Sequence, residues 1–302
     1  MATKEQTQKQ TITDNVKETA LKVKQKIVEV IDENGNGEID LEDVIIKGLK
    51  TPGIKIDRTT FLEQQLTKKY PQEVIDKVIA TSPMKAHIPL SEIDKIANSV
   101  ISFERNCVSG ISAALGMPGG VAMVATLPAD LLQYYGYLLR ATQKLLYLYG
   151  FPQIDVKEKG SKFDDATMNT LILCFGIMYS VNGANNGIKA MAGALAKGIE
   201  KKIFREAITK GTLFKIAKKV VHVFGVKLTK KVVSDFFKAA LPIVGGVVGG
   251  GLTYLSFKPC CDKLKETLRD TILSNPDYKP IYDEEYEYSF FEESTENEDK
   301  AK

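Results

Sequence analysis

Twelve consecutive residues, 32–43, carry oxygen-bearing side chains at the spacing that a calcium-binding loop requires. The segment is DENGNGEIDLED, with Gly37 at the sixth place, where such a loop turns sharply. Ca²⁺ is held there by side-chain and backbone oxygens from places one, three, five, seven, nine and twelve. Those places hold Asp32, Asn34, Asn36, Glu38, Asp40 and Asp43. The sequence therefore predicts one Ca²⁺ site, with Glu38 contributing its backbone carbonyl and Asp40 acting through water.

Two features of this loop bear on what the ion would do. The twelfth place is Asp43 rather than glutamate, and its shorter side chain reaches less easily for bidentate coordination. No second loop of this kind occurs, whereas calcium sensors usually pair two. We therefore expect weak to moderate affinity and a structural rather than a sensing role, in which the ion stabilises the folded state that binds it. The alternative is a helix–turn–helix whose loop is polar because it is exposed.

Basic residues gather in a second segment. From Lys197 to Lys238 there are twelve Lys and Arg against three acids, and TLFKIAKKVVHVF within it separates apolar from basic positions at helical spacing. This pattern predicts an amphipathic helix that binds an anionic membrane surface or an acidic protein. The lysines expected to make that contact are Lys215, Lys218, Lys219, Lys227, Lys230 and Lys231. A bundle helix with a solvated outer face explains the same pattern, and nucleic acid is less favoured because no stacking platform accompanies the charge.

Acidic residues dominate the end of the chain instead. From Asp283 to Lys302 there are nine acids against two lysines. Such a composition cannot bury enough apolar surface to order itself, so we predict a disordered tail over residues 275–302. Its charge is opposite to that of the basic segment, and we expect that it can compete there with anionic partners.

A catalytic constellation is not evident. The chain has two histidines, His87 and His222, and neither lies in a nucleophile motif or a metal-ligand pair. Polar residues near apolar segments are the remaining candidates for a pocket, and they are Asp130, Arg140, Asn182, Asn185 and Asn186. The lack of a catalytic motif favours a non-enzymatic protein. The alternative is an enzyme that acts on a lipid or other apolar substrate bound in a pocket near these five residues.

The elements that must position these residues are helices. Apolar residues recur at helical spacing in 13–31, 60–70, 91–105 and 128–149, and strand patterns are sparse. We expect capping at Thr60, a helix start at Pro128 and a helix end at Gly150. The fold class is therefore all-α, a helical bundle with glycine-rich, tightly packed helices, preceded by the calcium-type helix–loop–helix.

Three stretches lack charge: 106–129, 166–188 and 239–257. Their length raises the possibility of membrane spans, but glycine, proline or asparagine interrupts each one, so buried helices of a bundle are preferred and an integral membrane protein is the alternative. The polar start predicts no secretory signal. The four cysteines form no metal or disulfide pattern, which is typical of a reducing cytoplasm.

Two blocks of the sequence are similar to a known family. GMPGGVAMVATLPADLLQYYGYLLRATQKLLYLYG resembles the glycine-rich turn and "PAD" helix of the bacterial EcsC family, and GVKLTKKVVSDFFKAALPIVGGVVGGGLTYLSF resembles its C-terminal signature. The resemblance spans roughly residues 90–270 and implies a bacterial, cytoplasmic helical protein associated with the inner face of a membrane, with no established reaction. We therefore predict a disordered leader at 1–12, the calcium-type module at 13–56, an EcsC-like domain at 57–274 and the acidic tail.

Overall fold

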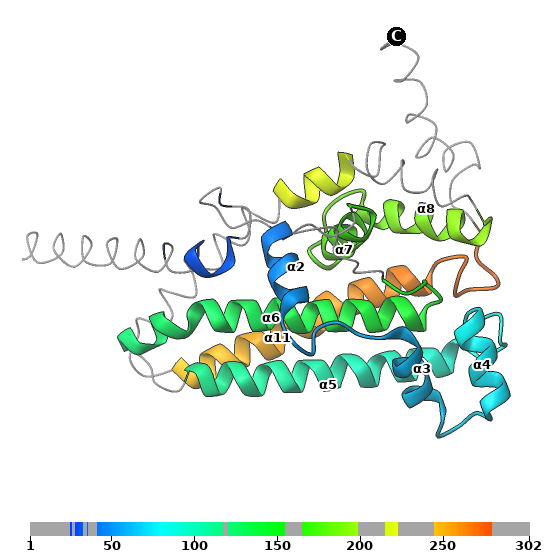
Figure 1. Cartoon of the computed structure of the whole chain (residues 1–302), viewed down its shortest axis with the longest axis horizontal. Helices are drawn as coiled ribbons and strands as arrows, with labels where there is room; N and C mark the ends of the chain where they lie inside the picture. Colours follow the sequence, from blue (N-terminus) through cyan, green and yellow to red (C-terminus); the bar gives the residue numbers. More distant parts are fainter. Residues whose placement is uncertain are drawn as a thin grey trace, which may run out of the picture.

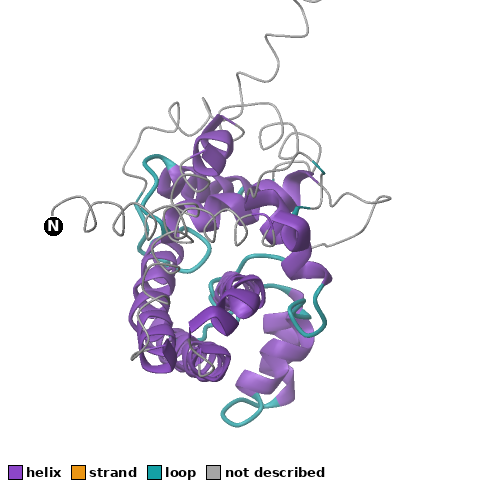
Figure 2. Cartoon of the chain, turned by 90° about the vertical axis from the view of Figure 1, so that its left-hand side faces the viewer, coloured by secondary structure: helices purple, strands orange, loops and turns teal. Residues whose placement is uncertain are grey.

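Helices make up all the regular structure that can be described. The computed structural model describes residues 25, 28–32, 35, 41–116, 120–154, 165–198, 215–222 and 245–279. Within these ranges no strand occurs, and the prediction of an all-α fold is confirmed (Figure 2). The named helices are α2 (Leu41–Lys50), α3 (Arg58–Leu66), α4 (Gln72–Ala80), α5 (Leu90–Gly116), α6 (Gly120–Leu148), α7 (Asp165–Met178), α8 (Ala184–Ala196) and α11 (Gly245–Arg269).

Three long helices, α5, α6 and α11, form the centre of the bundle (Figure 1). Helices α5 and α11 run antiparallel, because Asp94 near the start of α5 accepts a hydrogen bond from Nε of Arg269 at the end of α11, at 2.9 Å. Further along the pair, the Arg105 guanidinium stacks 3.9 Å above the Tyr254 ring. Asp94 also accepts from the Tyr149 hydroxyl at 2.7 Å, so one carboxylate joins the ends of all three helices.

Helices α7, α8 and the segment 215–222 pack beside this centre, and glycine allows their close approach. A methyl group at Gly176 of α7 would lie 2.6 Å from Val220 and 2.9 Å from the Cβ of Ala184. Only a residue without a side chain leaves room at this position for the side chains of Val220 and Ala184. This supports tight, glycine-dependent packing at the α7 contact.

Helix α2 crosses α6 and is held there by its apolar face (Figure 1). A methyl group at Gly48 of α2 would lie 2.6 Å from Cδ1 of Leu139 on α6. The side chains that α2 buries to 2% exposure or less include Leu41, Val44, Ile45 and Leu49. The end of the calcium-type module is therefore part of the same core as the bundle.

Helices α3 and α4 are held by polar contacts at their ends, and the cap of α3 differs from the one expected. We predicted that Thr60 caps α3, but Asp57 is the cap: its carboxylate accepts the Thr60 backbone N–H at 2.8 Å and the Thr60 hydroxyl at 2.8 Å. These bonds lower the pKa of Asp57, the backbone contribution being the larger. Next to it, the buried Arg58 donates to the carbonyls of Ile79 at 2.7 Å and of Val78 at 3.2 Å, and so satisfies the last turn of α4.

The uncharged stretches are distributed over several helices. Helix α5 continues past Arg105 to Gly116, and α6 begins at Gly120, upstream of Pro128. Residues 166–188 form two helices, α7 and α8, joined by a turn, rather than one long span. Helix α6 ends at Leu148, and Gly150, the predicted stop, follows with a φ of 90°. In the part of the chain that the structure describes, none of the helices combines the length and the apolar character of a membrane span.

Candidate functional site

The first end of the predicted calcium loop has the geometry of a tight polar turn. Residues 28–31 are helical, and Asp32 continues them by donating its backbone N–H to the carbonyl of Val28 at 2.9 Å. The Asp32 carboxylate then turns inward, where Oδ1 accepts the backbone N–H of Gly35 at 2.6 Å. Gly35 has a φ of 73°, a conformation that favours glycine. The loop therefore starts by folding back on the side chain predicted to be its first ligand.

The other end of the loop runs into α2. Helix α2 begins at Leu41, and Asp43, the predicted twelfth-place ligand, is fully buried in its first turn. Negative charge is favoured at this end of a helix by the backbone dipole. The remaining predicted ligands, Asn34, Asn36, Glu38 and Asp40, lie outside the described residues. Among the described residues no three His, Cys, Asp or Glu side chains gather at one point.

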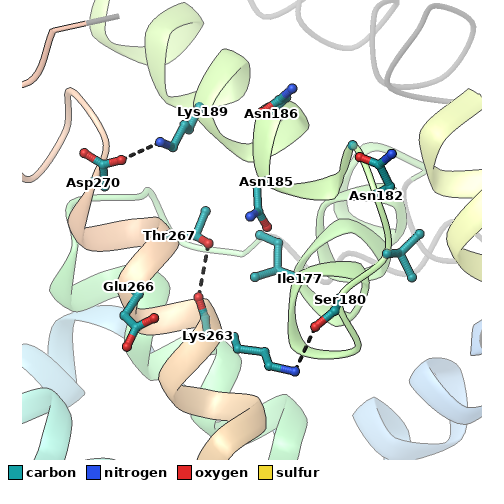
Figure 3. A pocket seen from close by; sticks show the side chains of 12 residues that line it. Ile177, Ser180, Asn182, Asn185, Asn186, Lys189, Lys263, Glu266, Thr267 and Asp270 are labelled. Carbon is teal, nitrogen blue, oxygen red and sulfur yellow. Dashed lines mark hydrogen bonds and ion pairs between the residues drawn. The ribbon is translucent and has the colours of Figure 1, made fainter. Parts of the chain in front are cut away.

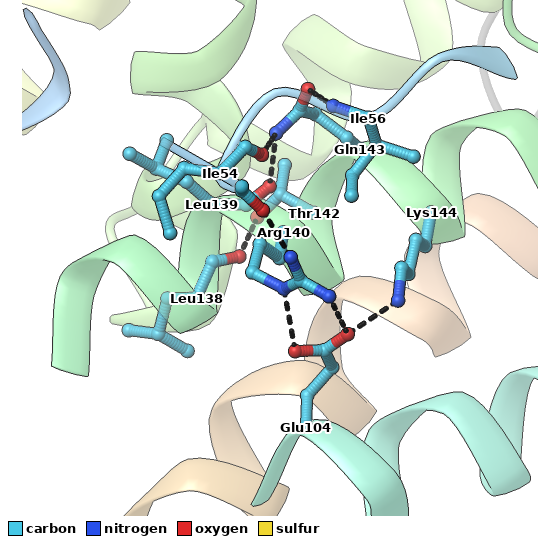
Figure 4. A network of polar contacts seen from close by, with 10 residues as sticks. Ile54, Ile56, Glu104, Leu138, Leu139, Arg140, Thr142, Gln143 and Lys144 are labelled. Atoms are coloured by element: carbon cyan, nitrogen blue, oxygen red, sulfur yellow. Dashed lines mark hydrogen bonds and ion pairs between the residues drawn. The ribbon is translucent and has the colours of Figure 1, made fainter. Parts of the chain in front are cut away.

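Residues 51–57, which follow α2, are bound to α6 through side-chain amides and cations (Figure 4). The amide of Gln143 donates to the carbonyl of Ile54 at 2.9 Å and accepts the N–H of Ile56 at 3.0 Å. Arg140 donates to the carbonyl of Gly53. The loop module is thus fixed to the bundle by polar contacts as well as by apolar burial.

Arg140 also belongs to a buried ionic network. Its Nε donates to Glu104 of α5 at 2.9 Å, and Lys144 contacts the other oxygen of the same carboxylate (Figure 4). The Glu104 side chain is 0% exposed. The sequence groups Arg140 with Asp130 and the asparagines as candidate pocket residues. The structure instead commits Arg140 to this network, while Asp130 accepts a hydrogen bond from Ser112 at 2.5 Å.

Sequence reasoning missed Glu104, although a signal was present. Ala97, Ile101 and Val108 are all buried on α5, and Glu104 falls on the same helical face. A carboxylate within such an apolar stripe must be compensated by cations or hydrogen bonds. A search of the neighbouring helices for paired cations would have led to Arg140 and Lys144.

The three predicted asparagines do line a cavity. Asn182 lies in the turn between α7 and α8, and Asn185 and Asn186 lie in the first turn of α8. All three belong to the lining of a space of about 730 Å³ beside α11, and Asn185 points into it (Figure 3). Neither Asp130 nor Arg140 belongs to its lining. Ile177 and Val181 supply its few apolar side chains, and the rest of the lining is polar, charged or glycine. This lining does not favour a lipid or other apolar substrate.

The basic segment is described over residues 215–222, and Lys227, Lys230 and Lys231 lie outside the described residues. Ala217 and Val220 are buried against the bundle, at 1% and 0% exposure. Lys215, Lys218 and Lys219 are exposed on the outer side. The apolar face of this segment is therefore packed on protein, so an anionic partner would meet the lysines without insertion of that face.

Two thiols of the described ranges, those of Cys174 and Cys261, are buried. Burial raises the pKa of the Cys174 and Cys261 thiols, which keeps both in the neutral, unreactive form. His87 is exposed on a turn with a φ of 61°, and His222 is exposed on the basic segment.

These features define an all-α bundle protein in which α2 is packed on α6 and a polar cavity lies between α8 and α11. Comparison of the chain with protein-family models, with curated proteins and with solved structures finds no match. The resemblance to the EcsC family therefore stays a prediction from the two sequence blocks that carry it.

Proposed function

We propose that this protein binds one Ca²⁺ ion in the loop 32–43, without catalysing a reaction, and that the ion holds α2 in place on the bundle. The observation that supports the proposal best is the turn at the start of the loop, where the Asp32 carboxylate accepts the Gly35 N–H at 2.6 Å. This bond holds one carboxylate oxygen inside the turn. Asp43, the carboxylate at the predicted twelfth place, lies in the first turn of α2.

Titration calorimetry with CaCl₂ tests this proposal on the full chain. The heat of Ca²⁺ binding to the wild type should fit a single-site isotherm. Asp32→Ala should show no binding heat, because the first ligand is lost. Glu29→Gln is the matched control, since it removes an exposed carboxylate just before the loop and should bind as the wild type does. Absence of binding to the wild type at millimolar Ca²⁺, or equal binding by Asp32→Ala, overturns the proposal.

A second activity is supported by a different observation, the exposed lysines of segment 215–222. We infer an EcsC-like, cytoplasmic protein that associates peripherally with the inner membrane face or with an acidic protein. Because Ala217 and Val220 are buried, the association would depend on charge and would weaken as salt screens it.

Sedimentation with lipid vesicles tests this second activity. Binding to phosphatidylserine-containing vesicles should exceed binding to pure phosphatidylcholine and should fall at high salt. The double variant Lys218→Glu, Lys219→Glu should bind at least about tenfold more weakly, because each basic residue near such a surface contributes about 1 kcal/mol. Lys85→Glu, an exposed lysine on the turn before α5, is the control. Equal binding to both lipids, or an unchanged double variant, contradicts the inference.

A further inference from the structure

The cavity between α8 and α11 has the size and the polar groups of a small-molecule site. Its volume of about 730 Å³ falls in the range of natural ligand pockets. One wall is the α7–α8 turn with the start of α8, and the other is the last part of α11 (Figure 3). Neither wall belongs to the predicted calcium loop or to the basic segment, so this site is independent of the functions proposed above.

The charges around the cavity are balanced, and two of the four form an ion pair with each other. Its lining carries two lysines and two acids. Lys189 forms an ion pair with Asp270, and Lys263 donates to the hydroxyl of Ser180 at 2.8 Å. Neither an anion nor a cation is therefore favoured by the net charge, and an entering anion would also meet the carboxylate of Glu266. A neutral ligand fits this arrangement best.

Several polar side chains of the lining have hydrogen-bond donors and acceptors that no other protein group uses. Within the described part of the chain, the side-chain amides of Asn182, Asn185 and Asn186 and the Glu266 carboxylate make no hydrogen bond or ion pair with other protein groups, and Asn182, Asn185 and Glu266 are exposed to solvent. Each amide offers two N–H donors and a carbonyl acceptor. Hydroxyl groups are the natural complement, because each can donate to one of these oxygens and accept from an amide N–H. In Figure 3 Asn185 points into the space between α8 and α11.

The turn that carries Asn182 is held in an uncommon conformation. Ser180 has a φ of 57°, which is rare for a residue with a side chain. Its hydroxyl is fixed by Lys263 from α11, so the two walls of the cavity are tied together at this point. Strained residues persist where the surrounding structure enforces them and are concentrated at ligand sites. A preformed arrangement also lowers the entropy lost when a ligand binds.

We propose that this cavity binds a small, neutral, polyhydroxylated molecule, a sugar or a cyclitol. Its hydroxyls bond first the amide of Asn185, which points into the space, and the other polar side chains of the lining surround it. With few apolar contacts available, a ligand of about a dozen heavy atoms binds with a dissociation constant on the order of millimolar.

Nuclear magnetic resonance of the ¹⁵N-labelled full chain tests the proposal, with glucose and myo-inositol as probes and inorganic phosphate as the anionic comparison. At least one of the two polyols should shift the side-chain amide signals of Asn185 and Asn186 saturably, and phosphate should not. Asn185→Ala should weaken that binding about tenfold, since it removes hydrogen bonds to the ligand. Because Asn185 is exposed, this variant should keep the amide spectrum of the folded protein.

Asn106→Ala, an exposed asparagine on α5, is the matched control and should bind as the wild type does. Three results overturn the proposal: no saturable shift with either polyol, saturable shifts with phosphate alone, or polyol binding that Asn185→Ala leaves unchanged.

Discussion

Replacing Glu104 by glutamine should strongly destabilise the bundle. The Glu104 side chain is 0% exposed, while Arg140 and Lys144, which share it, are 21% and 12% exposed. Removing one partner of a buried ion pair typically costs 3–5 kcal/mol, because the opposite charge is left uncompensated. Here both cations keep some contact with water, so we expect the lower end, about 3 kcal/mol. That is a large fraction of a typical folding free energy, which is about 5–15 kcal/mol.

Urea unfolding followed by far-ultraviolet circular dichroism measures this loss. With a slope of about 3 kcal/mol per molar urea, the midpoint should fall by about 1 M while the slope is unchanged. Glu92→Gln on the same helix is the control: Glu92 also contacts two lysines, but at the surface, where ion pairs contribute little. Lys144→Met should lower the free energy of unfolding by less than Glu104→Gln does, because Arg140 still compensates the charge of Glu104. A Glu104→Gln midpoint equal to that of Glu92→Gln would refute the reasoning, as would an equal loss in Lys144→Met.

Further predictions concern the packing of two glycines and the ionisation of Tyr147 and Glu92. Gly176→Ala should destabilise the protein by about 1–3 kcal/mol in urea unfolding, because its methyl group would lie 2.6 Å from Val220. Gly110→Ala, with no atom within 4 Å of its methyl, should instead stabilise by about 1 kcal/mol, and loss of this contrast would contradict the packing. Burial raises the pKa of Tyr147 to about 12, so the stability that its neutral phenol contributes is complete below pH 10 and lost as the pH rises through 12. Tyr147→Phe should therefore remove this loss of stability from the alkaline unfolding curve. Hydrogen bonds from Lys69 and then Lys95 lower the pKa of Glu92 to about 2, although these surface contacts should add little to stability. A carboxyl titration by nuclear magnetic resonance that finds an ordinary pKa would disprove this assignment.

The sequence predicted the helical class well because apolar spacing reports burial on one helix face, whatever that face contacts. Helix boundaries were predicted less well, since neighbouring residues compete to cap. Asp57 and Thr60 are both good caps, and the structure uses the Asp57 carboxylate to accept from Thr60. The length of α5 was underestimated because the charged residues end at Arg105, whereas the helix continues with Val108 and Ser112 buried. The length of α6 was underestimated because Pro128 was taken as its start.

Site residues were predictable where the local sequence itself determines the geometry. The asparagines that line the cavity all lie within residues 182–186, so their proximity follows from the chain. Arg140 and Asp130 could not be assigned in this way, because the contacts of a helical side chain depend on which helix packs against it. Arg140 contacts Glu104 and Gly53, which precede it in the chain by 36 and 87 residues. Such partners depend on the tertiary arrangement of α5, α6 and the residues after α2.

Calcium can act on a helix–loop–helix in two ways, by exposing the apolar face of the second helix or by fixing that helix where it lies. Exposure would require α2 to release Leu41, Val44, Ile45 and Leu49, each at 2% exposure or less. At about 1.5–3 kcal/mol for each side chain, the cost is roughly 6–12 kcal/mol. Ca²⁺ at a hundred times its dissociation constant contributes only about 2.7 kcal/mol.

The ion should therefore stabilise the packed arrangement rather than open it. Adding Ca²⁺ should raise the melting temperature without increasing the fluorescence of a dye that binds exposed apolar surface. Asp32→Ala should lose the rise in melting temperature, because it lacks the first ligand. Glu29→Gln should retain it. An increase in dye fluorescence with Ca²⁺ in the wild type would show that α2 leaves the bundle, and the fastening role would then be wrong even though the ion binds.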